Sequence, residues 1–229
     1  IYTSVAARRM GIRRSDVALA RVVKRSIDAR QRNVKGNLSI EIYVDREPQP
    51  APVHCDYPDV SKRTEVVIVG SGPAGLFAAL RLIELGYKPI VLERGRDVSA
   101  RKRDIAQINR NGAIDPNSNY AFGEGGAGTF SDGKLFTRSK KRGDYNKALQ
   151  TLVFHGAVPD ILFEAHPHIG TDRLPRIMTN VRQTILSSGG EFLFDSCVTG
   201  LIINGERVEG VVCGDRRIEA AAVVLATGH

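Results

Sequence analysis

The chain has 229 residues, and its 33 Lys and Arg residues outnumber its 25 Asp and Glu residues, so the formal net charge is +8. This length is sufficient for one large domain, or for a domain with an appendage, and for a closed hydrophobic core. Hydrophobic residues make up 42% of the chain and charged residues 25%, and these ordinary globular values exclude a mainly disordered chain. The longest apolar run, residues 220–226, has the length of a strand, so we expect no membrane-spanning helix.

The positive charge is concentrated in the N-terminal quarter. Residues 1–64 carry 13 basic and 7 acidic side chains, whereas residues 65–229 carry 20 and 18. Contact with nucleic acid is therefore considered only for this quarter, where phosphate binding would make affinity fall steeply with salt. The interpretation we favour is that its arginines form the solvated face of an amphipathic helix: Arg8, Arg9, Arg13, Arg14, Arg21, Arg25 and Arg30.

The three cysteines, Cys55, Cys197 and Cys213, are scattered and include no CxxC pair. They predict neither a disulfide framework nor a zinc knuckle, so a reducing compartment is expected. The cytoplasm is the predicted location, with a plastid as the alternative for a plant or algal source.

The N-terminal segment predicts a small basic α/β domain over residues 1–47. Apolar residues recur near a 3.6-residue period and predict a helix over residues 5–32, and alternation predicts a strand over 38–45. Three prolines at 48–52 break regular structure, so residues 48–63 are predicted to be a linker. Residues 64–229 then form a second domain.

A glycine motif begins this second domain. An apolar run at 66–69, after Glu65, leads directly into a GxGxxG turn at Gly70, Gly72 and Gly75, and a helical pattern and a second strand at 88–93 follow. GxGxxG at a strand-to-helix turn inside a βαβ unit of about 30 residues is typical of dinucleotide binding. Gly70 would permit the tight turn, Gly72 the approach of a pyrophosphate to the helix N-terminus, and Gly75 close packing of helix and strand.

Glu93 follows Gly75 by eighteen positions, at the end of the second strand. A carboxylate at this place can accept hydrogen bonds from the adenosine ribose hydroxyls, and it would repel a 2′-phosphate. The alternative is a surface glutamate at the end of a strand in a domain that binds no nucleotide.

A second glycine cluster occupies residues 119–136. Gly123, Gly125, Gly126 and Gly128 lie within six positions, and Thr129 and Ser131 follow, so the loop could wrap a phosphate or a flavin ring. The segment 128–134 also fits the GxxxxGK pattern of nucleoside triphosphatases, but Leu135 stands where Ser or Thr would bind magnesium and no strand precedes it. We interpret that match as accidental.

The remaining residues predict helices over 148–154 and 174–187 and strands over 191–194, 198–203, 207–213, 217–219 and 222–226. Asn204-Gly205 is a strong hairpin signal. His166 and His168 have no third ligand nearby in the sequence, so no metal site is predicted. His168 and Lys134 are polar groups of interest, but the sequence assigns no catalytic residue.

These motifs together resemble a family of FAD-dependent dehydrogenases, large bacterial flavoproteins with plastid relatives and an FAD domain of the glutathione-reductase type. The resemblance rests on the Gly70–Gly75 turn, the Glu93-Arg94-Gly95 segment, the run from Gly125 to Leu135, the segment from Pro167 to Leu174 and the terminal Ala226-Thr227-Gly228-His229. It implies a Rossmann-like parallel sheet with a β-meander insertion at 198–219, preceded by the small α/β domain.

The resemblance implies FAD as the cofactor, and it assigns groups of residues to its parts. The pyrophosphate would lie on Gly70, Ser71, Gly72, Pro73, Ala74 and Gly75, and the ribose on Glu93. Arg94 would flank the adenine, Arg101 would reach the phosphates, and the backbone of Val198 would meet the adenine. The isoalloxazine would lie near Gly125, Gly126, Ala127, Gly128, Thr129 and Ser131, and a strand end would pass the cofactor at Ala226, Thr227 and Gly228.

The implied function is that of an oxidoreductase in which hydride passes to or from the flavin on an unidentified small substrate. NAD(P)H or another molecule is considered as the electron partner. No CxxxxC redox pair follows the glycine turn, so a disulfide-reductase mechanism is not expected, and no second GxGxxG turn is present, so no nicotinamide-binding domain is expected in this chain. Domains of this type continue into a substrate domain, so we expect the chain to be an N-terminal fragment. The alternatives are a non-catalytic dinucleotide-binding module and a flavoprotein that contacts RNA.

Overall fold

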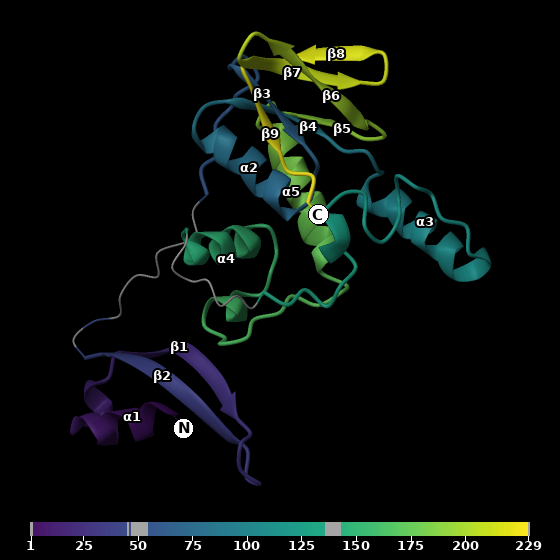
Figure 1. Cartoon of the computed structure of the whole chain (residues 1–229). Helices are drawn as coiled ribbons and strands as arrows, with labels where there is room; N and C mark the ends of the chain where they lie inside the picture. Colours follow the sequence, from purple (N-terminus) through teal and green to yellow (C-terminus); the bar gives the residue numbers. More distant parts are fainter. Residues whose placement is uncertain (1, 45, 47–54, 136–142, 229) are drawn as a thin grey trace. The chain divides into compact units, whose positions relative to one another are not determined.

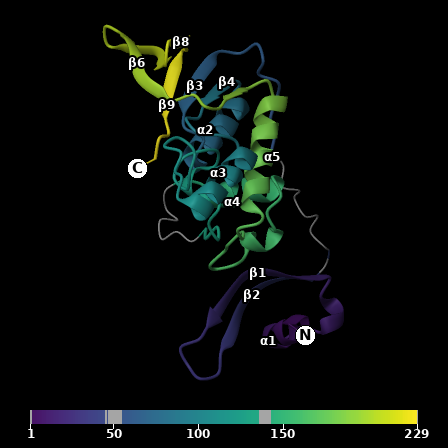
Figure 2. The same ribbon diagram turned by 90° about the vertical axis from the view of Figure 1, so that its right-hand side faces the viewer.

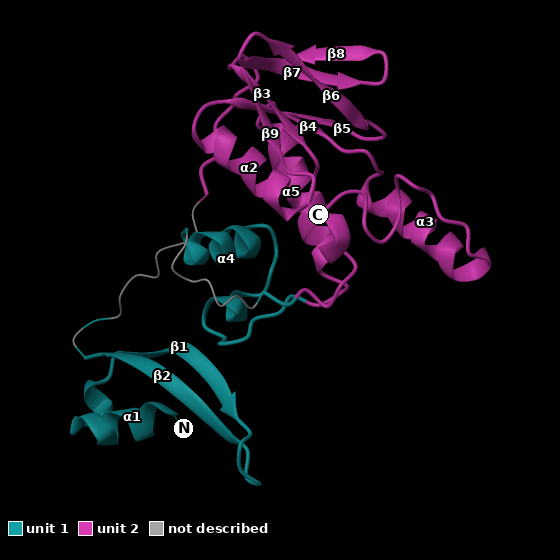
Figure 3. Ribbon diagram, in the orientation of Figure 1, with its two compact units in different colours: residues 1–54, 134–169 teal, residues 55–133, 170–229 magenta. Residues whose placement is uncertain are grey.

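The computed structural model describes residues 2–44, 46, 55–135 and 143–228, and these form two compact units (Figures 1 and 3). Unit 1 comprises residues 1–54 and 134–169, and unit 2 comprises residues 55–133 and 170–229. Among the helices of the described residues, none is both long enough and apolar enough to cross a membrane.

Unit 2 is built on a four-stranded parallel sheet. Its strands are β3 (Glu65–Val69), β4 (Lys88–Leu92), β5 (Glu191–Leu193) and β9 (Ala222–Leu225), in the order β5-β4-β3-β9. Helix α2 (Pro73–Glu84) connects β3 to β4, and Gly86, with a φ of +80°, follows its end. The predicted βαβ unit and parallel α/β fold are confirmed.

The two faces of this sheet are covered by different elements. On one face lies the antiparallel meander β6 (Val198–Asn204), β7 (Arg207–Cys213) and β8 (Arg216–Glu219), and on the other lie α2 and α5 (Leu174–Ser187) (Figures 1 and 2). Val67, Val69, Ile90 and Leu92 form one buried cluster with Val211 of β7. Residues 66–69 are all buried, as expected of a strand covered on both faces. The predicted meander, the helix at 174–187 and the hairpin turn at 204–205 are confirmed.

After β4 the chain forms α3 (Val98–Asn111) and then a long loop that contains the short 3₁₀ helix η2 (Gly126–Gly128). The Asp97 carboxylate accepts hydrogen bonds from the N–H groups of Ser99 and Ala100, which caps the N-terminus of α3. Gly112 ends α3 in the left-handed conformation with a φ of +71°. The loop therefore starts from a well-defined helix.

Unit 1 contains a two-stranded antiparallel sheet with helical segments. Its elements are α1 (Tyr2–Met10), η1 (Arg14–Asp16), β1 (Leu19–Asp28), β2 (Lys35–Tyr43), α4 (Tyr145–Phe154) and η3 (Pro159–Leu162). The predicted helix over 5–32 is wrong beyond Met10. Leu19, Val23 and Ile27 are spaced by four residues, and that spacing suits one face of a strand as well as one turn of a helix. Pairing with β2, which follows β1 after residues 29–34, favours the strand.

Backbone pairing within unit 1 joins β1 to residues 160–165. The Arg25 N–H donates to the Phe163 carbonyl at 2.8 Å, and the Ala165 N–H donates to the Arg25 carbonyl at 2.8 Å. Arg25 also forms ion pairs with Asp160 and Glu164. Residues 134–169 thus group with the N-terminal segment in unit 1, and the predicted domain over residues 64–229 stays a prediction. Residues 48–54 of the predicted linker lie outside the described residues, and residues 55–63 belong to unit 2, where Val60 is buried.

These contacts also bear on the basic N-terminal residues. Arg21 pairs with Glu41 at 2.6 Å across the β1–β2 ladder, and Arg30 pairs with Asp28 at 2.7 Å. Part of the positive charge is thus matched by carboxylates of unit 1, although Arg21 and Arg25 lie on a strand and not on the predicted helix.

Candidate cofactor site at the glycine turn

The turn between β3 and α2 leaves the N-terminus of the helix without a side-chain cap. Gly70 turns the chain with a φ of +101°, and its N–H donates to the Leu92 carbonyl at 2.8 Å. Gly72 is the N-cap of α2, and Pro73 follows it as the first helical residue. The first N–H groups of a helix lack intrahelical partners and carry partial positive charge. The turn therefore offers donors to an anionic group.

The three glycines of the motif have different surroundings. A Cβ atom at Gly75 would lie 1.9 Å from the Gly70 carbonyl oxygen, and one at Gly70 would lie 2.6 Å from the Ala226 carbonyl oxygen. A Cβ atom at Gly72 would have no atom within 4 Å. Packing therefore requires glycine at Gly70 and Gly75, whereas the space beside Gly72 is open. This open space at an uncapped helix N-terminus fits the diphosphate of a dinucleotide.

Glu93 lies at the end of β4 and is 4% exposed. Its Oε2 accepts hydrogen bonds from the Ser71 N–H at 2.8 Å and the Ser71 hydroxyl at 2.7 Å, and its Oε1 accepts from the N–H groups of Gly95 at 2.9 Å and Gly123 at 3.2 Å. The carboxylate thus ties the glycine turn to the loop after α3. Its predicted contact with a ribose stays a prediction.

Replacing Glu93 by Gln is expected to lower the free energy of unfolding by about 2–4 kcal/mol, because hydrogen bonds to a charged group contribute about 1.5–3 kcal/mol each. A neutral amide also presents an NH₂ group to the two donors that bind one of the carboxylate oxygens. Ser71→Ala, which removes one of the four donors, should cost about 1 kcal/mol. Urea unfolding of both variants measures the difference. An E93Q protein as stable as the wild type would contradict this structural role.

The second glycine cluster lies against the glycine turn. The Gly125 N–H donates to the Ser71 carbonyl at 2.9 Å, and a Cβ atom at Gly126 would lie 3.3 Å from the Gly72 Cα. Ala127 and Gly128 in η2 are exposed, as are Pro73 and Ala74 at the start of α2. The structure therefore brings together two segments that the sequence singled out separately.

The hydroxyl groups of this loop form hydrogen bonds within it. Thr129 is 1% exposed, and its hydroxyl donates to the Glu124 carbonyl at 2.9 Å. The Ser131 hydroxyl donates to the Gly128 carbonyl at 2.7 Å and accepts from the Gly133 N–H at 3.1 Å. Both side chains thus help to shape the loop.

The chain after β9 also reaches the glycine turn. The Ala226 N–H donates to the Val69 carbonyl at 2.9 Å, which places Ala226 beside Gly70. Thr227 and Gly228 are exposed. His229 lies outside the described residues.

The two residues predicted near adenine lie in the same unit. The Arg94 guanidinium donates to the Asn117 side-chain oxygen at 2.9 Å and lies over the Phe122 ring, 4.2 Å from its centroid. Val198, at the start of β6, is half-buried, pairs with Cys213 and packs against the core cluster.

Arg101 is fully buried, and the loop surrounds it. The acceptors of its hydrogen bonds are carbonyl oxygens of residues 119–124 and the Thr129 hydroxyl. Burial lowers the pKa of Arg101 to about 10, while the carboxylates of Glu93 and Glu124 oppose this shift. The predicted contact of Arg101 with phosphates stays a prediction.

A buried carboxylate of this region and the half-buried arginine that pairs with it were not predicted. The Glu124 carboxylate is fully buried and accepts from the Val98 N–H at 2.8 Å and from Arg182 Nε at 2.8 Å. Burial raises the pKa of Glu124, and Arg182 and the Val98 N–H partly offset this effect. Glu124, as a single carboxylate among four glycines, could have been recognised in the sequence. Arg182 lies 58 positions further along the chain, and no motif pointed to it.

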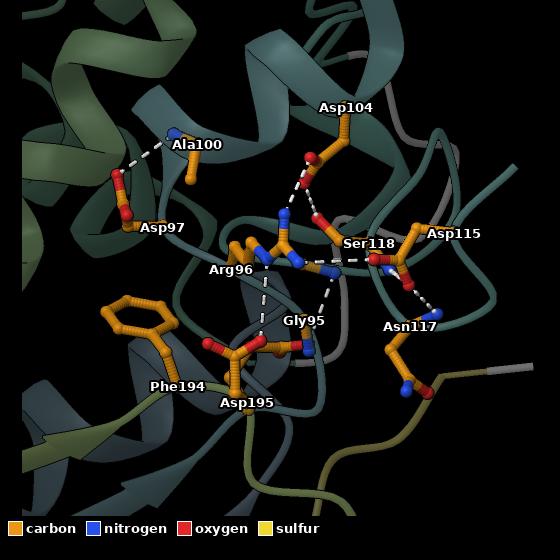
Figure 4. A network of polar contacts seen from close by, with 12 residues as sticks. Gly95, Arg96, Asp97, Ala100, Asp104, Asp115, Asn117, Ser118, Phe194 and Asp195 are labelled. Atoms are coloured by element: carbon orange, nitrogen blue, oxygen red, sulfur yellow. Dashed lines mark hydrogen bonds and ion pairs between the residues drawn. The ribbon is translucent and has the colours of Figure 1, made fainter. Parts of the chain in front are cut away.

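Arg96 was also missed, and it joins three segments (Figure 4). Its guanidinium forms ion pairs with Asp104 of α3 at 2.9 Å, Asp115 of the following loop at 3.5 Å and Asp195 after β5 at 3.6 Å. The Ser118 hydroxyl donates to Asp104 at 2.5 Å. This network holds the base of the loop to α3.

Lys134, His166 and His168 belong to unit 1 and lie outside this site, whereas the GxxxxGK match overlaps the second glycine cluster. The GxxxxGK match begins at η2, with no strand before it, as the sequence indicated. Lys134 and His168 of unit 1 face each other in an isolated antiparallel bridge. In residues 2–44, 46, 55–135 and 143–228, no group of three or more His, Cys, Asp or Glu residues could hold a metal ion.

Comparison with known proteins gives two family matches. Residues 1–43 match a domain of unknown function (DUF8436), and residues 63–111 match the FAD binding domain. The second match contains β3, the glycine turn, α2, β4 and α3.

Several relatives are similar over much of the chain. An uncharacterized protein of Clostridium beijerinckii is 36% identical, with 97% of this chain and 44% of the relative covered. The probable electron transfer flavoprotein-quinone oxidoreductase YdiS of Escherichia coli is 29% identical (72% and 36% covered), and the 6-methylpretetramide 4-monooxygenase of Streptomyces rimosus is 31% identical (66% and 34% covered). The chain thus spans less than half the length of these relatives.

Solved structures with a similar fold include THI4 of Thermovibrio ammonificans, which is 21% identical with a TM-score of 0.45 over 72% of this chain and 58% of that chain. CtdE in complex with FAD is 17% identical with a TM-score of 0.38 over 73% and 39%. The match of residues 63–111 is to the FAD binding domain, and this match identifies FAD as the cofactor.

Proposed function

We propose that the whole protein is an FAD-dependent oxidoreductase of the dehydrogenase type, in which unit 2 provides the FAD-binding domain. The observation that carries this proposal is the uncapped N-terminus of α2 beside the open space at Gly72, within the segment that matches the FAD binding domain. The oxidoreductase names of two relatives support the reaction class. The substrate is an unidentified small molecule, with NAD(P)H or another molecule as electron partner.

The site residues divide by exposure into two groups. The residues that would contact the cofactor directly are exposed or half-buried: Gly70, Gly72, Pro73, Ala74, Gly126, Ala127, Gly128, Thr227 and Gly228. The residues that would hold them in place are buried: Ser71, Gly75, Glu93, Arg101, Gly125 and Thr129. In this proposal the N–H groups at the start of α2 bind the diphosphate, and Arg94 and Val198 flank the adenosine end.

The bound flavin would accept or donate hydride, and the protein would orient it and exclude water. Glu93 would orient the cofactor through its hydrogen bonds to the glycine turn, and a ribose hydroxyl would bind this carboxylate in place of one of its present donors. The proposed domain layout keeps the boundary near residues 48–63, with the cofactor residues after it.

FAD binding by the 229-residue chain tests the proposal directly. The purified protein is expected to be yellow and to keep its flavin absorption through desalting, and to bleach on anaerobic reduction. Titration of the flavin-free protein with FAD should quench flavin fluorescence, and a large excess of ADP should compete. A colourless protein that binds adenine nucleotides but not FAD would instead indicate a non-catalytic nucleotide-binding module.

A further inference from the structure

The side chain of Arg101 leaves α3 and ends inside the loop of residues 117–133. Its Nε donates to the Asn119 carbonyl at 2.8 Å, its Nη2 donates to the Tyr120 carbonyl at 3.0 Å, and its Nη1 donates to the Glu124 carbonyl at 2.7 Å. Longer contacts of 3.3 Å join Nη1 to the Gly123 carbonyl and to the Thr129 hydroxyl. One guanidinium thus binds acceptors from five residues of the same loop.

The loop is shaped around this side chain. Gly123 has a φ of +114°, and a Cβ atom there would lie 2.5 Å from Arg101 Cδ. The Phe130 ring lies under the guanidinium, 5.2 Å from Cζ to its centroid. Both the backbone conformation at Gly123 and the aromatic neighbour therefore suit an arginine at this position.

The buried charge is compensated within unit 2. A buried guanidinium is unfavourable unless its donors are matched and opposite charge is near. Here loop carbonyls match the donors, and the carboxylates of Glu93 and Glu124 favour the charged form. The loop residues that bind Arg101 lie outside strands, so their carbonyl oxygens have no β-ladder partner. The guanidinium N–H groups of Arg101 supply these hydrogen bonds instead.

The loop in turn contacts the glycine turn through the hydrogen bond from Gly125 to Ser71 and the close approach of Gly126 to Gly72. We propose that Arg101 is a positioning residue that preforms the loop of residues 119–131 before FAD binds, so that Gly126–Gly128 stand beside the helix N-terminus, and that it does not itself contact the phosphates. The effect of this loop on FAD binding rests on the proposed function. The preformed loop itself is a property of the flavin-free protein.

Hydrogen–deuterium exchange of the flavin-free 229-residue chain tests this inference. In Arg101→Met, the amides of residues 119–131 are expected to exchange at least tenfold faster than in the wild type, because charge-assisted hydrogen bonds hold this loop. Exchange in β3 and β4 should stay slow. Arg103→Met, at an exposed position on the same helix, is the matched control and should exchange like the wild type.

FAD titration separates positioning from direct contact. Arg101→Met should bind FAD at least tenfold more weakly, and saturating FAD should restore much of the protection of residues 119–131. Arg101→Lys keeps the charge but has no fork of donors, so it should fold and still show faster exchange in the loop. Unchanged exchange in the flavin-free variants together with weaker FAD binding would overturn the inference in favour of phosphate contact. A wild-type chain that binds no FAD would refute the proposed function without altering the exchange result.

Discussion

Gly75→Ala is expected to lower the free energy of unfolding by about 2–4 kcal/mol, the range of an overpacked core position. The added methyl group would lie 1.9 Å from the Gly70 carbonyl oxygen and 3.3 Å from Ile68 Cγ2. Both contacts involve groups fixed by the parallel sheet, so the turn must move away from β3. Urea unfolding, followed by circular dichroism, measures the loss.

Gly72→Ala is the matched variant, three positions earlier in the same turn. Its methyl group meets no atom within 4 Å, so stability should fall by no more than about 1 kcal/mol, from the poorer N-cap. The same methyl group occupies the space through which a diphosphate would approach α2, so FAD affinity should fall at least tenfold. A Gly72→Ala protein that binds FAD like the wild type would show that the cofactor does not approach the helix here.

The elements of unit 2 could be predicted from the sequence because each has a local signature. β3 is apolar from Val66 to Val69, the glycine spacing marks the turn, and the meander strands are separated by Asn204-Gly205 and short polar turns. The residues of the turn, Glu93 and the second glycine cluster were singled out for the same reason. Their convergence in one site follows from the parallel order of β4, β3 and β9, which brings the ends of these strands to one edge of the sheet.

The contacts that hold the site together could not be predicted, because they join residues distant in sequence. Arg101 has several carbonyl acceptors 18 to 23 positions away, and no side-chain pattern encodes a carbonyl acceptor. The strand at 19–28 was missed because its spacing of apolar residues suits a helix equally well, and only its partner at 35–43 decides the outcome. The grouping of residues 134–169 with unit 1 depends likewise on pairs such as Arg25 with Phe163.

The ion pair between Glu124 and Arg182 joins the glycine loop to α5. Loss of this ion pair is expected to lower the free energy of unfolding about as much as Gly75→Ala does. Arg182→Met leaves the fully buried Glu124 carboxylate without its charged partner, so the free energy of unfolding should fall by about 3 kcal/mol at neutral pH. Arg176→Met, at an exposed position on the same helix, is the control and should change stability by no more than about 0.5 kcal/mol.

The loss in Arg182→Met should depend on pH in a defined direction. Burial already raises the pKa of Glu124, and Arg182 opposes that shift, so removing Arg182 raises the pKa of the folded state further. A carboxyl with a raised pKa binds more protons in the folded state than in the unfolded state, so stability falls as pH rises above the ordinary pKa of glutamate. Urea midpoints should therefore differ more between the variant and the wild type at about pH 8 than at about pH 5. In Glu124→Gln/Arg182→Met the side chain at 124 is neutral, so the pH-dependent part of the loss should disappear. An equal loss at both pH values would mean that Arg182 stabilises the protein through packing on Phe194 and not through its charge.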